Sequence, residues 1–174
     1  MSTISLKDKN NIAKKAASIV AEGSSVILGA GIPTKCLKFL NDKDCWDIYE
    51  TGIIGACPFT CGTETIIDAS RKKIGLREGG SIFDSSFIFS LIRSGRIKNA
   101  ILGALEVDRS GNVACHATHT RLWGYGGALD IYSYVEKKIF VLPQQRFVRT
   151  LSLPVSGKHI ADIVVTENGC YEIK

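Results

Sequence analysis

The chain has 174 residues, of which 45% are hydrophobic and 22% charged, a composition that excludes a disordered chain and predicts a single domain over residues 1–174. A net charge of +5 suits an anionic ligand such as a phosphate, but no basic stripe interleaved with aromatic residues indicates nucleic-acid binding. No run reaches the roughly 20 apolar residues of a membrane span, and no signal peptide is visible. The six cysteines are therefore typical of reduced thiols. We expect a cytoplasmic protein without a membrane contact.

The chain begins with a predicted helix, strand and glycine loop. Residues 7–22 repeat apolar side chains at helical spacing, and residues 25–28 are a short apolar run typical of a buried strand. Gly29 and Gly31 follow, and Pro33 begins the next helix. This order favours an anion-binding site, because helix N-termini attract negative charge. A tight turn that needs glycine accounts for the pair equally well.

A single acid stands at the end of the second predicted strand. The alternating run at residues 46–48 leads to Glu50, and a loop with Gly52 and Gly55 follows and ends at Pro58. A carboxylate at the end of a buried strand is costly to desolvate unless it has a partner or a task. Glycines beside it let backbone amides approach a ligand closely. The pattern leaves Glu50 as either a nucleophile or an ordinary loop acid.

A basic cluster and another amphipathic helix follow. Arg71, Lys72 and Lys73 are typical of a solvated charged face, and a clamp for an anion is the alternative interpretation. The glycine pair at 79–80 predicts a turn. Residues 84–95 place a capping side chain before an apolar face and a glycine after it, which predicts a helix.

The second half of the chain is richer in strands. Residues 98–108 are the most strand-like run, a glycine turn follows, and a strand resumes at residues 113–117. The glycine-rich segment at residues 124–128 leads into a helix and then a strand that ends at residue 142, and residues 163–173 predict a hairpin with Asn-Gly at its tip. The order of elements predicts an α/β fold, with a mostly parallel sheet covered by helices and antiparallel additions.

Two groups of potential metal ligands have spacings that match no common zinc site. Cys57 and Cys61 are four positions apart, and Cys115 lies close to His116 and His119. We therefore expect ordinary thiols and no metal. A cysteine nucleophile is also disfavoured, because the sequence near Cys57 contains no residue that would act as its general base. A serine nucleophile is disfavoured because no GxSxG motif is present.

Six segments of the chain resemble, in the same order, the B subunit of family I CoA-transferases, the heteromeric acetate, butyrate, acetoacetate or 3-oxoacid CoA-transferases. The resemblance runs from the first helix to residue 173. Each motif is weak alone, and the ordered set is specific. The segments are LGAGIPT (28–34), ETGIIGACP (50–58), GGSIFDSSFIFSLIRSGRI (79–97), ILGALEVDRSGNVA (101–114), GYGGALD (124–130) and LPVSGKHIADIVVTE (153–167).

This resemblance implies roles for particular residues. Glu50 matches the glutamate of the family's Glu-Asn-Gly motif and is implied to be the catalytic carboxylate, with Thr51 in place of the asparagine. Gly127 and Ala128 match positions that present backbone N–H groups to the thioester oxygen. Arg71 falls where related enzymes carry a lysine that contacts CoA. The full expected set is Gly29, Gly31, Gly52, Gly55, Gly126, Gly127 and Ala128 for the oxyanion or substrate, and Arg71 and Lys72 for CoA.

The implied activity is that of the catalytic beta subunit of an acyl-CoA:carboxylate CoA-transferase. CoA would move between short-chain acids or 3-oxoacids through a covalent glutamyl-CoA thioester, with CoA as a substrate and no metal or redox cofactor. A separate A (alpha) subunit would complete the site, in an α2β2 heteromer. The alternatives are a non-catalytic CoA- or sugar-phosphate-binding regulatory module of the same fold and an acyl-CoA hydrolase.

Overall fold

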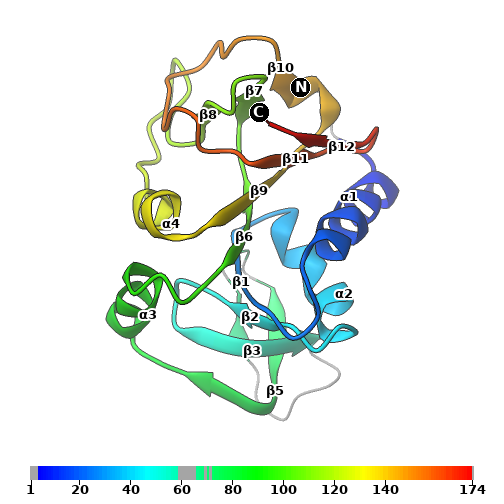
Figure 1. Ribbon diagram of the computed structural model, residues 1–174, viewed down its shortest axis with the longest axis vertical. Helices are drawn as coiled ribbons and strands as arrows, with labels where there is room; N and C mark the ends of the chain where they lie inside the picture. The colour runs from blue at the N-terminus through cyan, green and yellow to red at the C-terminus, as the bar shows by residue number, and fades with distance from the viewer. Residues whose placement is uncertain (1–3, 59–65, 69, 71, 174) are drawn as a thin grey trace.

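The computed structural model describes residues 4–58, 66–68, 70 and 72–173 (Figure 1). Within them, nine strands form one sheet in the order β12-β11-β9-β6-β1-β2-β3-β5-β4. Their bounds are β1 Ser25–Leu28, β2 Trp46–Ile48, β3 Ile53–Pro58, β4 Ile66–Ile67, β5 Lys73–Ile82, β6 Asn99–Gly103, β9 Lys137–Val141, β11 Ile163–Val165 and β12 Cys170–Glu172. The run from β11 to β2 is parallel, and antiparallel strands extend it at both edges. The predicted α/β fold is therefore confirmed.

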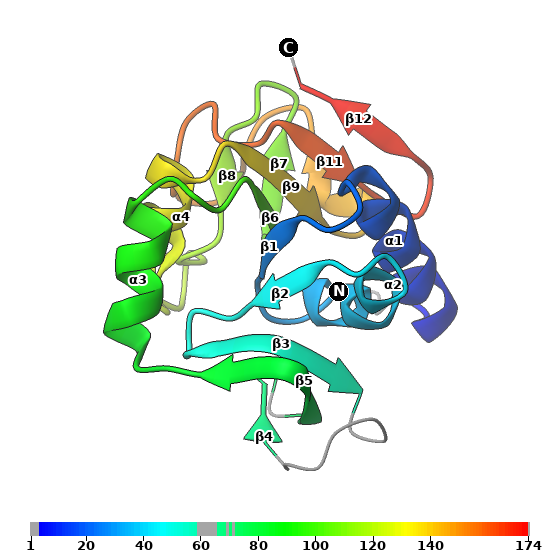
Figure 2. The ribbon, with the colours of Figure 1, turned by 60° about the horizontal axis from the view of Figure 1, so that its bottom comes forward.

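Helices cover both faces of this sheet (Figure 2). On one face, α1 (Leu6–Ile19) and the short pair η1 (Pro33–Cys36) and α2 (Leu37–Asn41) bury Ile12, Ala16 and Leu40 against the sheet. On the other face, α3 (Ser85–Arg93) and α4 (Ala128–Tyr134) bury Ile92 and Ile131. The sheet therefore lies between two apolar layers. None of the helices in the described residues is both long and apolar enough to cross a membrane.

Local capping explains where the two longer helices begin. The Ser5 side chain accepts a hydrogen bond from Asp8 N at the start of α1, and Asp84 accepts one from Ser86 N at the start of α3. Each cap satisfies an N–H that has no partner inside the helix. The predicted helices are confirmed, although α1 ends at Ile19, three residues before the predicted end.

Two predictions for the segments around β3 are wrong. The segment from Gly52 to Pro58 is not a loop, because β3 returns along β2 as an antiparallel strand and pairs Ile54 with Ile48. The glycine pair at 79–80 lies inside β5 and not in a turn. In both cases pairing between β3 and β5 supplies backbone hydrogen bonds that the local sequence does not reveal.

The long strand predicted over residues 98–108 is divided between two sheets. Residues of β6 belong to the large sheet, whereas β7 (Glu106–Asp108) pairs with β8 (Val113–Ala114) and β10 (Phe147–Val148) in a three-stranded sheet. The chain leaves one sheet and enters the other at Ala104 and Leu105. This break opens the end of β6 toward a cavity. The remaining helix, η2, spans Gln144–Arg146.

Candidate active site

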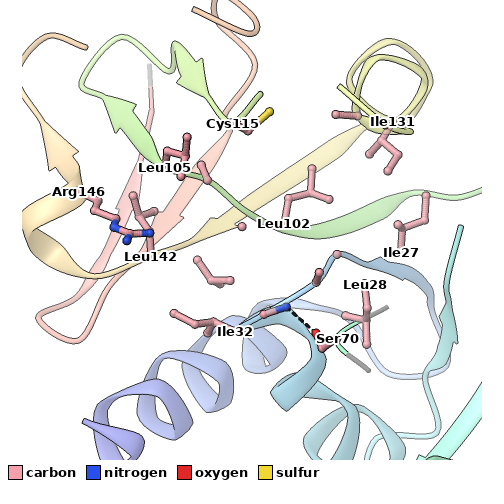
Figure 3. Close-up of a pocket in the computed structure, with 18 of the residues that line it drawn as sticks. Ile27, Leu28, Ile32, Ser70, Leu102, Leu105, Cys115, Ile131, Leu142 and Arg146 are labelled. Carbon is pink, nitrogen blue, oxygen red and sulfur yellow. Dashed lines mark hydrogen bonds between the residues drawn. The ribbon is translucent and has the colours of Figure 1, made fainter. Parts of the chain in front are cut away.

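A cavity of about 700 Å³ lies at the carboxyl ends of the central parallel strands. Its wall includes Leu28 at the end of β1, Leu102 in β6 and Leu142 just after β9 (Figure 3). Ligands of open α/β sheets bind at this edge, because the loops that follow parallel strands meet there. The volume is within the range of small-molecule sites.

Glu50 lies in this cavity, two residues after β2 ends. A tight turn follows it, in which Gly52 N donates to Tyr49 O at 3.0 Å and Tyr49 N donates to Ile53 O at 2.8 Å. Gly52 has a φ of +115°, and a Cβ there would strike the carbonyl of Phe83, so only glycine fits. The turn therefore holds Glu50 at the end of the strand.

The side chain of Glu50 is half-buried and faces the turn before α4. A Cβ at Gly127 would overlap Glu50 Oε2 and the ring of Phe89, so the carboxylate lies directly against the Gly127 backbone. Burial raises the pKa of Glu50 above its ordinary value, because desolvation disfavours the charged form. A carboxylate partly stripped of water and held against a glycine is arranged to act as a nucleophile.

Of the two amides expected as donors in the Gly126–Ala128 turn, the one of Ala128 is already engaged. Ala128 N donates to Tyr125 O at 3.1 Å, so this N–H is already engaged within the turn. Within the described part of the chain, the N–H of Gly127 donates no hydrogen bond. Gly126, Gly127 and Ala128 all line the cavity. The geometry thus favours Gly127 over Ala128 as the donor to a ligand oxygen beside Glu50.

Gly29 and Gly31 also line the cavity, but their amides serve the fold. Gly29 N donates to Ile101 O at 3.0 Å, which joins the end of β1 to β6. Gly31 N donates to Ser70 Oγ at 2.8 Å (Figure 3), and its φ is +87°. The two glycines therefore line the cavity, and neither has a free N–H to offer to a ligand.

The structure does not bring Gly52 and Gly55 into the cavity. Gly52 is confined by Phe83, as described above, and Gly55 has a φ of +75° with no room for a Cβ beside the ring of Trp46. Gly55 lies at an irregularity of the pairing between β3 and β5. Neither residue lines the cavity, and both permit tight turns and close packing.

The basic cluster is only partly described. Lys72 lines the cavity, whereas Arg71 lies outside the described residues. Sequence reasoning missed two further lysines in the cavity wall, Lys9 on α1 and Lys35 in η1. Lys35 belongs to no charge run and Lys9 lies in a short run of mixed sign, Lys7-Asp8-Lys9, so no basic pattern in the sequence singled them out. The fold alone brings them near Lys72.

Cys115 and His116 are engaged in other contacts. Cys115 Sγ lies 3.3 Å from Tyr132 Oη in the cavity wall, and His116 Nδ1 lies 2.7 Å from Ser156 Oγ. Across the described ranges, no group of three or more histidine, cysteine, aspartate or glutamate side chains is placed to hold a metal ion. Cys57 is buried in β3, and Cys61 lies outside the described residues.

Comparisons with known proteins identify the family of this chain. The family model described as Coenzyme A transferase matches residues 9–146. The chain is 32% identical over 171 residues to the B subunit of the Helicobacter pylori succinyl-CoA:3-ketoacid coenzyme A transferase, a match that covers 92% of this chain and 83% of its relative. It is 29% identical over 177 residues to the rat mitochondrial succinyl-CoA:3-ketoacid coenzyme A transferase 2A, covering 95% of this chain and 34% of the rat enzyme.

A solved structure shows the same fold. The acyl-CoA transferase apoenzyme from Escherichia coli O157:H7 superposes with a TM-score of 0.73 at 20% identity, over 100% of this chain and 37% of that one. The chain thus spans about a third of the length of the rat and E. coli relatives and most of the length of the H. pylori relative. The family-model match, the relative of similar length and the shared fold together place this chain in the coenzyme A transferase family.

Proposed function

We propose that the chain is the catalytic beta subunit of an acyl-CoA:carboxylate CoA-transferase, with Glu50 as the nucleophile. The observation that carries the proposal is the contact between the Glu50 carboxylate and the Gly127 backbone inside the cavity. The substrates are short-chain or 3-oxoacids and their CoA thioesters, a class that the names of its relatives also indicate.

The first half of the reaction transfers CoA to the enzyme. A carboxylate oxygen of Glu50 attacks the carbonyl carbon of acyl-CoA, and the C–S bond breaks to give an acyl-glutamyl anhydride and CoA thiolate. The thiolate attacks the γ-carbonyl carbon of Glu50 and releases the first acid as its carboxylate. The product is a glutamyl-CoA thioester.

The second half runs the same steps in reverse with another acid. Its carboxylate attacks the γ-carbonyl carbon and displaces CoA thiolate, and the thiolate then attacks the acyl carbonyl of the new anhydride. The new acyl-CoA leaves, and the Glu50 carboxylate is restored. Protons and electrons balance over the cycle, so we propose that no metal or redox cofactor takes part and that CoA is a substrate.

Gly127 is proposed to stabilise the oxyanions of these steps. Its N–H has no partner among the described residues, and the residue itself lies against the carboxylate that reacts. An amide aimed at developing negative charge lowers the barrier, and removal of one such donor typically slows a reaction by about 10²–10³-fold. A side chain at this position would block the approach of the reacting carbonyl.

A separate alpha subunit is proposed to complete the site, in an α2β2 heteromer. The segment that leads into the Gly126–Ala128 turn exposes large apolar side chains, with Leu122 at 74% and Trp123 at 50% relative exposure. Exposed apolar side chains beside a reaction site are typical of a surface that another protein covers. We propose that the alpha subunit lies against Leu122 and Trp123.

The experiment combines the chain with its alpha partner and tests for a covalent intermediate. The complex is incubated with acetoacetyl-CoA and then reduced with borohydride, which converts a glutamyl thioester to an alcohol that peptide mass spectrometry locates. We expect modification at Glu50 and loss of activity. A Glu50→Gln complex should show neither the adduct nor transfer to acetate.

The matched control is Glu167→Gln. Glu167 lies outside the cavity wall and its Oε2 accepts a hydrogen bond from Gln144 N, which glutamine can also accept. This variant should keep both the adduct and the activity. Full transferase activity in the Glu50→Gln complex would refute the proposal, and release of free acid without an acceptor would identify a hydrolase instead.

A further inference from the structure

Three lysines from separate segments meet at the cavity. Lys9 belongs to α1, Lys35 to η1, and Lys72 precedes β5, and all three line the wall that also contains Glu50. Lys9 and Lys35 are partly buried, and Lys72 is exposed. Their convergence is a property of the fold, because they are separated by long stretches of sequence.

None of these three lysine side chains forms an ion pair within the described part of the chain, although Asp68 Oδ1 accepts the backbone N–H of Lys72 at 2.8 Å. The described ion pairs involve other residues, and none includes Lys9, Lys35 or Lys72. The pKa of Lys35 is lowered first by burial and then by the positive charges of Lys72, Lys9 and Lys38. Amines that are close enough to perturb one another and form no ion pair oppose folding and favour the binding of an anion.

The surrounding wall suits a ligand with one anionic part and one apolar part. Ser70 lies beside the cluster, where its Oγ accepts the N–H of Gly31 at 2.8 Å. Elsewhere the wall includes the apolar side chains of Ile32, Leu102 and Leu142, together with one further cation, Arg146 (Figure 3). A single ligand can therefore reach Glu50 with its reacting group, pass apolar side chains and place anionic groups among the lysines.

We propose that Lys9 and Lys35, together with Lys72, form a phosphate subsite that binds phosphate groups of the CoA substrate. The inference rests on the proposed function, which supplies a thioester for Glu50 and, on the same molecule, a diphosphate and a 3′-phosphate. Phosphate oxygens accept charge-assisted hydrogen bonds from ammonium groups, and these are among the stronger hydrogen bonds in proteins. Lys9 and Lys35 bind the substrate and take no part in the chemical steps.

The test compares three thioesters in the complex with the alpha subunit. Acetoacetyl-CoA carries the diphosphate and the 3′-phosphate, acetoacetyl-3′-dephospho-CoA carries the diphosphate alone, and acetoacetyl-pantetheine carries neither. The variants are Lys9→Gln, Lys35→Gln and the double variant. Lys14→Gln is the matched control, because Lys14 lies on the same helix, is exposed and does not line the cavity.

We expect Lys9→Gln and Lys35→Gln each to raise KM for acetoacetyl-CoA about tenfold and to leave kcat nearly unchanged. A tenfold change in KM corresponds to the loss of one weak charge-assisted hydrogen bond. With acetoacetyl-pantetheine the variants should match the wild type. Lys9→Arg and Lys35→Arg should restore most of the affinity, because they keep the positive charge. Calorimetric titration with free CoA should show the same loss of affinity without any turnover.

The dephospho substrate distinguishes the two phosphate sources. If the variants still raise KM with it, the lysines bind the diphosphate, and if the effect disappears, they bind the 3′-phosphate; both outcomes support the subsite. An equal loss with the pantetheine thioester, or no change with acetoacetyl-CoA, would overturn it. Failure of the proposed function is recognised separately, because the wild-type complex would then transfer none of the three thioesters.

Discussion

Glu50 and Gly127 occupy adjoining positions in the folded chain, and the Oε2 atom of Glu50 fills the space that a β-carbon at residue 127 would need. One residue follows the end of β2, and the other is the N-cap of α4. Their contact brings the carboxylate of one segment against the backbone of the other. It is the relationship on which the proposed chemistry depends.

Substitution of Gly127 by alanine should abolish most of the transferase activity. The new methyl group would overlap Glu50 Oε2 and the ring of Phe89, so the carboxylate must move. A displacement of about 1 Å can slow an enzyme by about 10²-fold, and we expect kcat of the complex to fall by at least that factor. The measurement is the rate of CoA transfer from acetoacetyl-CoA to acetate.

The control for this variant is Gly169→Ala in the hairpin between β11 and β12. A Cβ there meets the Tyr171 ring at an ordinary contact distance of 3.7 Å, and Gly169 does not have a left-handed φ. This variant should retain wild-type kcat. A Gly127→Ala complex within a few-fold of wild type would contradict the placement of Glu50.

The pH dependence of kcat/KM should reflect the raised pKa of the partly buried Glu50. Burial raises the pKa of Glu50 above 4.5, so the reactive carboxylate is lost at a higher pH than for an exposed glutamate. We expect kcat/KM to fall on the acid side with an inflection above pH 4.5. Circular dichroism at each pH checks that the complex stays folded. A profile that is flat down to pH 4.5 in a folded complex would be inconsistent with this assignment.

Asp47 should make the protein less stable as the pH rises toward neutrality. Its side chain is buried, Oδ2 accepts the N–H of Ala56 at 3.0 Å, and burial raises the pKa of Asp47 to about 6. The carboxyl group of Asp47 loses its proton near pH 4 in the unfolded chain but only near pH 6 in the folded chain. Between these two pH values the folded state binds more protons, so the free energy of unfolding falls as the pH rises, by up to about 3 kcal/mol.

Asp47→Asn should remove this dependence, since the amide oxygen can still accept from Ala56 and carries no charge. We expect denaturant unfolding of the variant to show a flatter pH dependence and greater stability than wild type at pH 7. Asp42→Asn, at an exposed position after α2, serves as the control and should follow the wild type. Parallel curves for wild type and Asp47→Asn would show that Asp47 is not the cause.

Occupation of the cavity should protect one cysteine and leave another reactive. Cys115 lines the cavity, whereas Cys170 is exposed in β12. Alkylation of Cys115 by iodoacetamide should slow when a thioether analogue of acyl-CoA is bound, because the ligand covers the thiol. Peptide mass spectrometry measures both sites, and Cys170 should react at the same rate with or without the analogue. If Cys115 were alkylated at the same rate with and without the analogue, the ligand would have to bind outside this cavity.

Short-range features of the fold are readable from the chain. The caps at Ser5 and Asp84 begin the predicted helices. The turn after β7 is closed by Asp108, whose Oδ1 accepts from Ser110 N and Asn112 N. Each of these depends on hydrogen bonds within a few residues, so local sequence is sufficient to predict it.

Features that depend on contacts between distant segments could not be predicted from the local sequence. Gly55 and Gly80 look like loop glycines, yet each lies in a strand because β3 and β5 pair over most of their length. Lys9 and Lys35 carry no motif and still reach the same cavity as Lys72. Ala128 matches the expected donor position, but its N–H is taken by Tyr125.

The amino-acid sequence by itself determined the helices, the main strands, the position of Glu50 at a strand end and the family resemblance, because periodicity, caps and ordered motifs are encoded in neighbouring residues. Only the tertiary structure decided which glycine lies against Glu50, which glycines line the cavity and which lysines gather there. These depend on contacts between segments distant in the chain, and such contacts form only when the sheet and its two helical layers pack together.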